Sequence, residues 1–370
     1  MGNCTRTHGK QVKRLRSLEA TLGKLKADKI SRAEAIDNLE QLRFQWRGDE
    51  LELRTLRELG QLYVADNQLR EAMGTMRLAI RNFGDSDEAR DAAAQMTGMF
   101  ESFFIGEQAN KLSPLDALSL FHDYKELTPV GVRGDEMIRR LVERLVAVDL
   151  LPQAAELLQH QVDNRLEGVA KSAVAVRLAV IYLLDKQPSK ALQTIRGTRQ
   201  TRLPDDLIEQ RDLVEARALS DTKDHDRALE AIETHTSEDA EQLRADILWD
   251  AQRWPEAAAK AESILGARYA GEESLDDLER MTLMRACVAY SLAGDSGSLE
   301  RLRSRFSQKM QNSPDANAFA MLTSAPDVTS EDYRTLVKRI ASVEMLEAFF
   351  NEFKAKGPVP AAAPEATAIN

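Results

Sequence analysis

Apolar positions recur at helical spacing through most of the chain, and several of them carry unusually small residues. In residues 56–80, Gly60 and Ala72 stand twelve positions apart, with Tyr63 nine positions before Ala72 and Ala79 seven positions after it. Apolar stripes of this period predict two amphipathic helices separated by a tight turn. A small residue on each of two facing helices lets their backbones approach closely.

The same frame recurs when Ala72 is taken as its anchor. Strong copies are anchored at Ala154, Ala191, Ala228 and Ala257, and weaker copies at Ala35, Ala117 and Leu299. The steps between successive anchors are 37, 45, 37, 37, 37, 29 and 42 residues. Four equal steps predict a helical repeat, in which each helix pair buries too little apolar surface alone and stacked pairs share one continuous core.

The prolines support this frame independently. Pro152 and Pro255 lie two residues before their anchors, and Pro114 and Pro188 lie three residues before theirs. Proline is tolerated in the first turn of a helix, where its missing N–H would have no intrahelical partner. Each anchor is therefore predicted to lie early in the second helix of its pair.

The frame around Ala72 resembles the tetratricopeptide repeat, most closely over residues 53–86 and in part over residues 16–313. The resemblance implies an all-α fold, a right-handed α-solenoid of stacked helix-turn-helix pairs. Later copies lack the family's glycine and closing proline, and the steps exceed its period of about 34 residues, which implies longer helices or loops. The runs "SPLDALSLFHDYKELTPVG" and "LLPQAAELLQHQVDNRL" also resemble the C-terminal part of long α-proteobacterial repeat proteins. That resemblance implies a bacterial protein, with this chain a fragment or a shortened version of one.

The frame and its interruptions predict how the chain is organised. We expect a basic N-terminal arm over residues 1–15, repeat pairs over 16–82 and 135–313, an irregular helical segment over 83–134, C-terminal capping helices over 314–356, and a disordered Pro/Ala tail over 357–370. The run "MFESFFIG" at residues 99–106 has aromatic residues on more than one side of a helix. Such a helix is typical of a buried core element, with a patch for self-association or for a partner as the alternative.

Charge is distributed unevenly along the chain. The net charge of −10 over 370 residues argues against binding of bulk nucleic acid. Residues 1–32 hold nine Lys or Arg and two acidic residues, a net charge of +7 that leaves −17 for the rest. This basic end fits a solvated helix face, an acidic partner, an anionic membrane surface or the chain's own acidic body.

Candidate chemistry is sparse. The five histidines show no metal-ligand spacing, and no catalytic or phosphate-binding motif is present in the sequence, so we expect a protein that is not an enzyme, with no cofactor and no metal. Two cysteines, Cys4 and Cys287, indicate a reducing compartment, which suggests the cytoplasm. The start "MGNCTR" resembles a myristoylation signal, but Arg6 stands where that signal has Ser or Thr.

The binding surface is predicted from the repeat geometry. In superhelices of this family the first helix of each pair lines the concave side, and its face opposite the packing stripe points into the groove. The positions on that face are Arg57, Gln61, Arg139, Glu143, Val180, Arg217, Asp246, Trp249 and Asp250. Arg139 and Arg217 are candidates for holding a carboxylate, with ion pairs inside the array as the alternative. Trp249 is a candidate anchor for an apolar side chain, with core packing as the alternative.

Two functions follow from these observations. The first is a non-catalytic scaffold that binds a partner protein or peptide in the concave groove, without nucleic acid. The second is a peripheral membrane or envelope assembly factor docked by its basic N-terminal segment. The Lys/Asn carboxylate clamp of chaperone-binding family members is not visible in this sequence, which argues against a chaperone-tail ligand.

Overall fold

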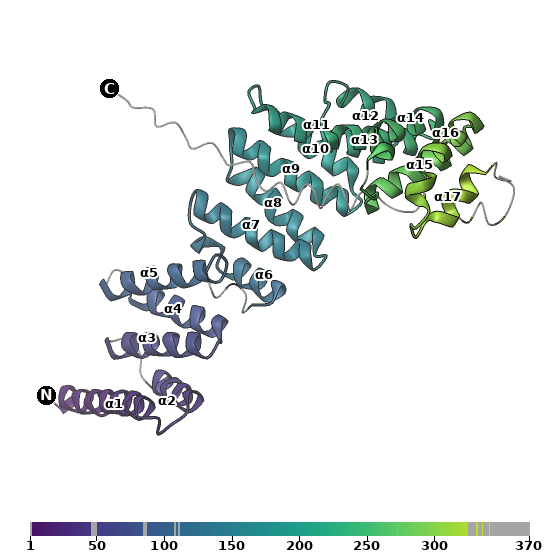
Figure 1. Ribbon diagram of the computed structural model, residues 1–370. Helices are drawn as coiled ribbons and strands as arrows, with labels where there is room; N and C mark the ends of the chain where they lie inside the picture. Colours follow the sequence, from purple (N-terminus) through teal and green to yellow (C-terminus); the bar gives the residue numbers. More distant parts are fainter. Residues whose placement is uncertain are drawn as a thin grey trace. The chain divides into compact units, whose positions relative to one another are not determined.

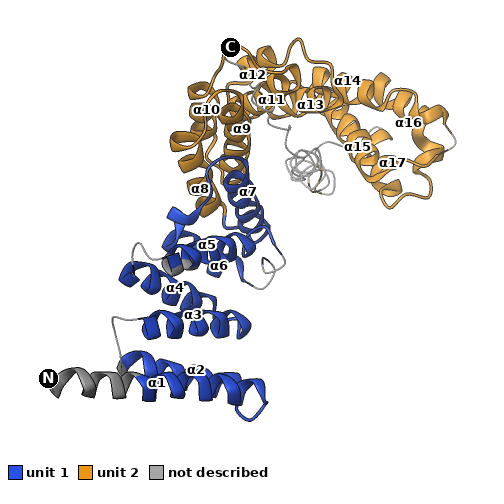
Figure 2. Ribbon diagram, turned by 90° about the vertical axis from the view of Figure 1, so that its left-hand side faces the viewer, with its two compact units in different colours: residues 1–150 blue, residues 151–370 orange. Residues whose placement is uncertain are grey.

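The computed structural model describes residues 2–45, 50–83, 87–106, 109, 112–271 and 273–324, with three single positions beyond them. Side chains are described from residue 12 onward, apart from residues 45, 88, 89 and 92. All regular secondary structure in this part of the chain is helical (Figure 1). The chain divides into two compact units, Met1–Leu150 and Leu151–Asn370 (Figure 2).

Unit 1 is a stack of helices in chain order. Its elements are α1 (Gly2–Lys26), α2 (Arg32–Gln45), α3 (Glu50–Ala65), α4 (Leu69–Phe83), α5 (Asp87–Ser102), α6 (Pro114–Asp123), the 3₁₀-helix η2 (Lys125–Leu127) and α7 (Val132–Ala147). Each of the helices from α1 to α4 packs against the next one, and α6 packs against α7.

Unit 2 repeats this arrangement over a longer stretch. Its elements are α8 (Leu151–Asn164), α9 (Gly168–Leu184), α10 (Pro188–Gly197), α11 (Asp205–Asp221), α12 (His225–Ala231), α13 (Glu238–Asp250), α14 (Trp254–Leu265), the 3₁₀-helix η3 (Arg268–Ala270), α15 (Asp277–Leu292), α16 (Ser296–Met310) and α17 (Ala316–Thr323). Consecutive helices pack together, and α11 also contacts both α9 and α13, so the first helices of these pairs form one row. The chain is an all-α solenoid of stacked helix pairs, as the frame implies.

The anchors take the place in the fold that the frame predicts. Each of the eight anchors is the fourth residue of an even-numbered helix from α2 to α16, and none is more than 4% exposed. At the best-matched pair, a Cβ atom on Gly60 would lie 3.1 Å from Cε of Met76 and 4.0 Å from the carbonyl oxygen of Ala72. The two backbones approach closely there because neither crossing residue carries bulk.

One turn recurs between the paired helices. The residue five positions before the anchor has a φ between 55° and 71° in six pairs. The six residues are Asn67, Asp149, Lys186, Lys223, Gln252 and Gly294. In each pair the next N–H donates to the carbonyl of the residue nine positions before the anchor, at 2.7–2.9 Å. This is a Schellman motif, and the large residue of the sequence frame, such as Tyr63 or Tyr182, accepts its closing bond.

The irregular steps have local causes. The 29-residue step arises because α12 has only seven residues, and the 45-residue step because α5 ends at Ser102 and α6 begins at Pro114. Two of the three weak copies, anchored at Ala35 and Ala117, fit less well in their first helices. Gly23 is exposed and Ile105 lies past the end of α5.

The aromatic run in residues 99–106 lies in the core of unit 1. Phe100, Phe103 and Phe104 are at most 1% exposed. The Phe100 and Phe104 rings lie 5.0 Å apart, and Phe104 meets Phe121 edge to face at 5.9 Å. Arg140 of α7 holds the following loop by donating to the carbonyl of Ile105 at 3.0 Å. The prediction of a core element is therefore confirmed.

At the N-terminal end a helix stands where an arm was expected, and at the C-terminal end the structure describes only part of the expected capping region. Helix α1 begins at Gly2, so residues 2–15, expected as an arm, and residues 16–26 form one helix. In the expected capping region 314–356 the structure describes α17, whereas most of the rest of that region lies outside the described residues. The expected Pro/Ala tail, 357–370, also lies outside them.

The turn predicts a stabilising substitution. Gln252 holds a left-handed conformation with φ of 57°, which costs an L-residue about 1 kcal/mol and glycine almost nothing. We expect Gln252→Gly to raise the free energy of unfolding by about 0.5–1 kcal/mol, measured by urea denaturation followed by circular dichroism. The matched control is Gln193→Gly, because Gln193 is exposed in the interior of α10. There the same replacement should cost about 1 kcal/mol, and equal effects at both sites would contradict the turn assignment.

Candidate binding surfaces

The predicted binding residues of unit 1 differ in whether ion pairs within the chain already engage their side chains. Arg57 and Gln61 are exposed on α3, one helical turn apart. On α7, Arg139 donates to both carboxylate oxygens of Glu136 at 2.6 Å and to Glu143 at 2.5 Å. Chiefly because Arg139 donates to it, the pKa of Glu136 falls to about 2. The guanidinium of Arg139 is thus engaged within its own helix, which supports the alternative of ion pairs inside the array.

In unit 2 the predicted binding residues include one buried apolar side chain and one partly buried ion pair. Val180 on α9 is buried and makes no surface. Nε of Arg217 on α11 lies 3.1 Å from Oδ1 of Asp221 one turn further on. Burial raises the pKa of Asp221, and the charge of Arg217 opposes that shift. Asp250 is exposed at the end of α13.

Asp246 and Trp249 are not surface groups, and this corrects their place among the groove candidates. They are 6% and 9% exposed. Asp246 accepts a hydrogen bond from Arg285 of α15, whose guanidinium lies 4.7 Å from the centre of the Trp249 ring. Trp249 also packs edge to face on Trp254 at 5.3 Å. The core alternative for Trp249 is therefore supported, and the two side chains join α13 to its neighbours.

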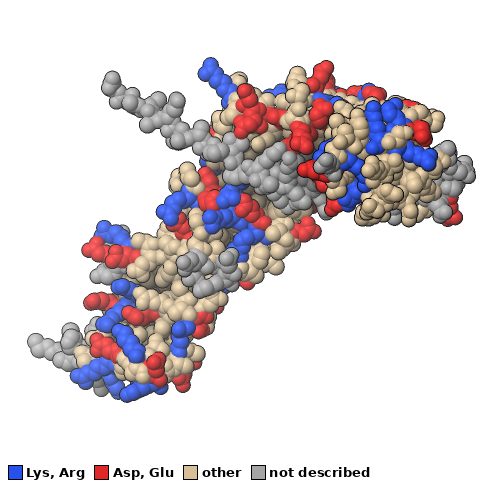
Figure 3. All heavy atoms as spheres, in the orientation of Figure 1, with Lys and Arg blue, Asp and Glu red and all other residues tan. Residues whose placement is uncertain are grey.

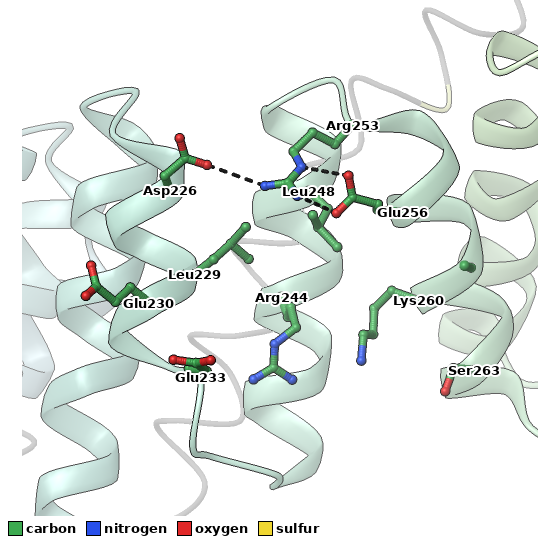
Figure 4. Close-up of a pocket in the computed structure, with 11 residues that line it drawn as sticks. Asp226, Leu229, Glu230, Glu233, Arg244, Leu248, Arg253, Glu256, Lys260 and Ser263 are labelled. Atoms are coloured by element: carbon green, nitrogen blue, oxygen red, sulfur yellow. Dashed lines mark hydrogen bonds and ion pairs between the residues drawn. The ribbon is translucent and has the colours of Figure 1, made fainter.

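A groove that the frame did not predict lies on the other side of α13, between the second helices α12 and α14 (Figure 4). It has a volume of about 740 Å³, within the range of about 300–1,000 Å³ typical of ligand sites. Leu229 of α12, Leu248 of α13 and Ala259 of α14 supply its apolar lining. We call this feature the α12–α14 groove.

Helix α12 ends beside the groove, and Arg244 holds the chain at that end. Arg244 of α13 donates to the carbonyls of Ile232 and His235 at 2.6 and 3.2 Å. Carbonyls at the end of a helix lack intrahelical partners, so these bonds stabilise the chain where α12 stops.

Ion pairs hold the cations that line the groove. Arg253 binds both oxygens of Glu256 and lies 3.4 Å from Asp226, which links α12 to α14 at one end (Figure 4). Lys260 lies 2.6 Å from Glu241. By contrast, within the part of the chain that the structure describes, the carboxylates of Glu230 and Glu233 lining the α12 side make no hydrogen bond or ion pair. The groove can therefore accept positive charge beside an apolar side chain.

Metal-ligating side chains do not gather into a site in the part of the chain that the structure describes. No group of three or more His, Cys, Asp or Glu side chains is arranged there to hold a metal ion. Cys287 is a free thiol inside α15, and burial raises its pKa. His235 lies 2.9 Å from Asp212 and joins the end of α12 to α11.

Among the described residues, no helix is both long enough and apolar enough to cross a bilayer. Lys and Arg side chains gather over α1 and α2 on the face drawn in Figure 3.

Comparisons with known proteins do not assign the chain to a family. No protein-family model matches the chain, and no curated protein matches it. Among solved structures, the chain is similar to the TPR domain of P58(IPK), with 14% sequence identity over 93% of this chain and 99% of that one, and a TM-score of 0.24. At that score the likeness carries no further conclusion, so the fold rests on the helix pairs themselves.

Proposed function

We propose that this chain is a non-catalytic scaffold that binds a segment of a partner protein, and that the α12–α14 groove is its binding site. The observation that carries the proposal is the groove itself, with its apolar lining and its two unpartnered carboxylates. The helices around it are fixed by ion pairs and by the repeat packing, and a pre-formed site binds without the cost of ordering its walls. A second surface, along the first helices at Arg57 and Gln61, stays a prediction.

The groove predicts which substitution removes a partner. Ala259 is exposed on α14 and lines the groove, so Ala259→Trp fills it without removing a core side chain. We expect affinity purification from the native cell, followed by quantitative mass spectrometry, to show partners retained by the parent chain and lost by this variant. The control is Gln193→Trp, which places the same indole on the exposed side of α10. Equal recovery by the two variants would refute the groove assignment.

A second candidate function is docking to an anionic membrane surface through the basic N-terminal segment. Lys13, Arg16 and Lys24 are exposed on α1, and clustered cations of this kind bind anionic lipid surfaces. Docking to a membrane through residues 1–32 therefore remains an alternative, and vesicle binding tests it below. The sequence has two cysteines and offers no disulfide framework, which supports our further proposal of a reducing compartment, the cytoplasm.

A further inference from the structure

The outer face of α1 combines apolar and basic side chains. Val12 and Leu15 are 40% and 36% exposed and lie on one side of the helix, three residues apart. Lys13 and Arg16 are exposed beside them, also three residues apart. Leu18, three residues beyond Leu15, is fully buried in unit 1, so Val12 and Leu15 form the exposed edge of the side of α1 that packs in this unit. Residues three apart on a helix are neighbours about one turn along the same face, so α1 presents an apolar pair with a cation pair beside it.

The α12–α14 groove presents the complementary pattern. Leu229 and Ala259 offer an apolar surface, and Glu230 and Glu233 stand three residues apart along the α12 side. The two carboxylates thus have the same separation in sequence as the cation pair of α1, with Glu230 in the last turn of α12 and Glu233 just after its end. An amphipathic helix laid into an apolar groove is a common mode of recognition between proteins, with charges at the rim setting its register.

The net charges of the two regions are also opposite. Residues 203–279, which contain the groove, hold eight Lys or Arg and 22 Asp or Glu, a net charge of −14. Residues 1–32 hold nine Lys or Arg and two acids, a net charge of +7. Opposite fields of this size accelerate association and weaken with added salt.

We propose that the α12–α14 groove of one molecule binds helix α1 of a second copy of this chain. Val12 and Leu15 lie against Leu229 and Ala259, and Lys13 and Arg16 pair with Glu230 and Glu233. The inference rests on the proposed function, because it names the partner of the same groove. The two surfaces differ, so the contact is heterologous and joins copies head to tail.

A charge swap tests this contact in the full-length chain. Sedimentation velocity over a range of protein concentrations should show reversible self-association of the parent at low salt, weakened at high salt. The double variant Glu230→Lys/Glu233→Lys should associate about tenfold or more weakly. Lys13→Glu/Arg16→Glu should be weakened similarly, and the chain that carries all four changes should recover most of the lost affinity. Ala259→Trp should abolish association and Gln193→Trp should leave it unchanged. All of these positions are at the surface, and circular dichroism verifies that each variant is folded.

The outcomes separate this proposal from the proposed function. The proposal that a second copy occupies the groove is overturned if the parent stays monomeric at every concentration. It is also overturned if the chain with all four substitutions self-associates as weakly as the two double variants. Binding of the monomeric parent to phosphatidylserine vesicles, lost in Lys13→Glu/Arg16→Glu, would assign α1 to a lipid surface instead and overturn it too. In either case the recovery of other partners by Gln193→Trp and not by Ala259→Trp would leave the groove's binding role intact.

Discussion

Replacing Asp246 by alanine is expected to lower the free energy of unfolding by about 3–5 kcal/mol, because it leaves the guanidinium of Arg285 buried without its carboxylate. The two residues are 6% and 9% exposed, and Arg285 donates directly to Asp246 across the space between α13 and α15. The Trp249 ring, 4.7 Å from the guanidinium, cannot replace a full negative charge. Urea denaturation followed by far-ultraviolet circular dichroism measures the loss.

Two further variants show whether the loss comes from the orphaned charge. Asp250→Ala removes a carboxylate from an exposed position one turn along α13, and it should change stability by no more than about 0.5 kcal/mol. The double variant Asp246→Leu/Arg285→Met removes both charges and should recover most of the lost stability. If the double variant is as unstable as Asp246→Ala, the ion pair is not the cause, and the packing around Trp249 must be reconsidered.

Enlarging an anchor alanine is expected to have the second largest effect. Ala257 is the fourth residue of α14 and 3% exposed. The gap beside it, lined by Ala245, Trp249 and Ala261 among others, has a volume of about 10 Å³. That space holds about one water molecule, whereas leucine adds three carbon atoms. We expect Ala257→Leu to cost about 2–3 kcal/mol by forcing α13 and α14 apart, in the same denaturation experiment.

Ala259 provides the matched control for this prediction. It lies two residues further along α14 and is exposed, so Ala259→Leu should change stability by no more than about 0.5 kcal/mol. A loss at Ala257 as small as the change at Ala259 would show that close approach at the anchor does not hold the pair together.

The fold could be predicted because its signals are local in the sequence. The distance from Tyr63 through Asn67 to Ala72 spans a helix end, a left-handed turn and the start of the next helix, and all three lie within ten residues. The same spacing returns in Tyr182, Lys186 and Ala191. Local hydrogen bonds and one helix crossing fix this unit, so its residue types repeat where the structure repeats.

The binding surface could be predicted only in part, because burial depends on distant residues. Asp246 was expected at the surface, but its partner Arg285 lies 39 residues further along the chain, and no pattern within one repeat connects them. The α12–α14 groove was missed for a related reason. Its only sequence signal was the 29-residue step, which shows that a helix is short and not which surface lies beside its end.

The sequence by itself determined the helix pairs, their turns and the small residues at their crossings, because each of these depends on neighbours within one repeat. Only the tertiary structure decided which charges are neutralised, as for Arg139 and Arg285, and which remain open, as for Glu230 and Glu233. The physical reason is that solvation and charge pairing are set by the side chains that successive helices bring together. Those neighbours come from other turns of the chain, so a repeating frame cannot encode them.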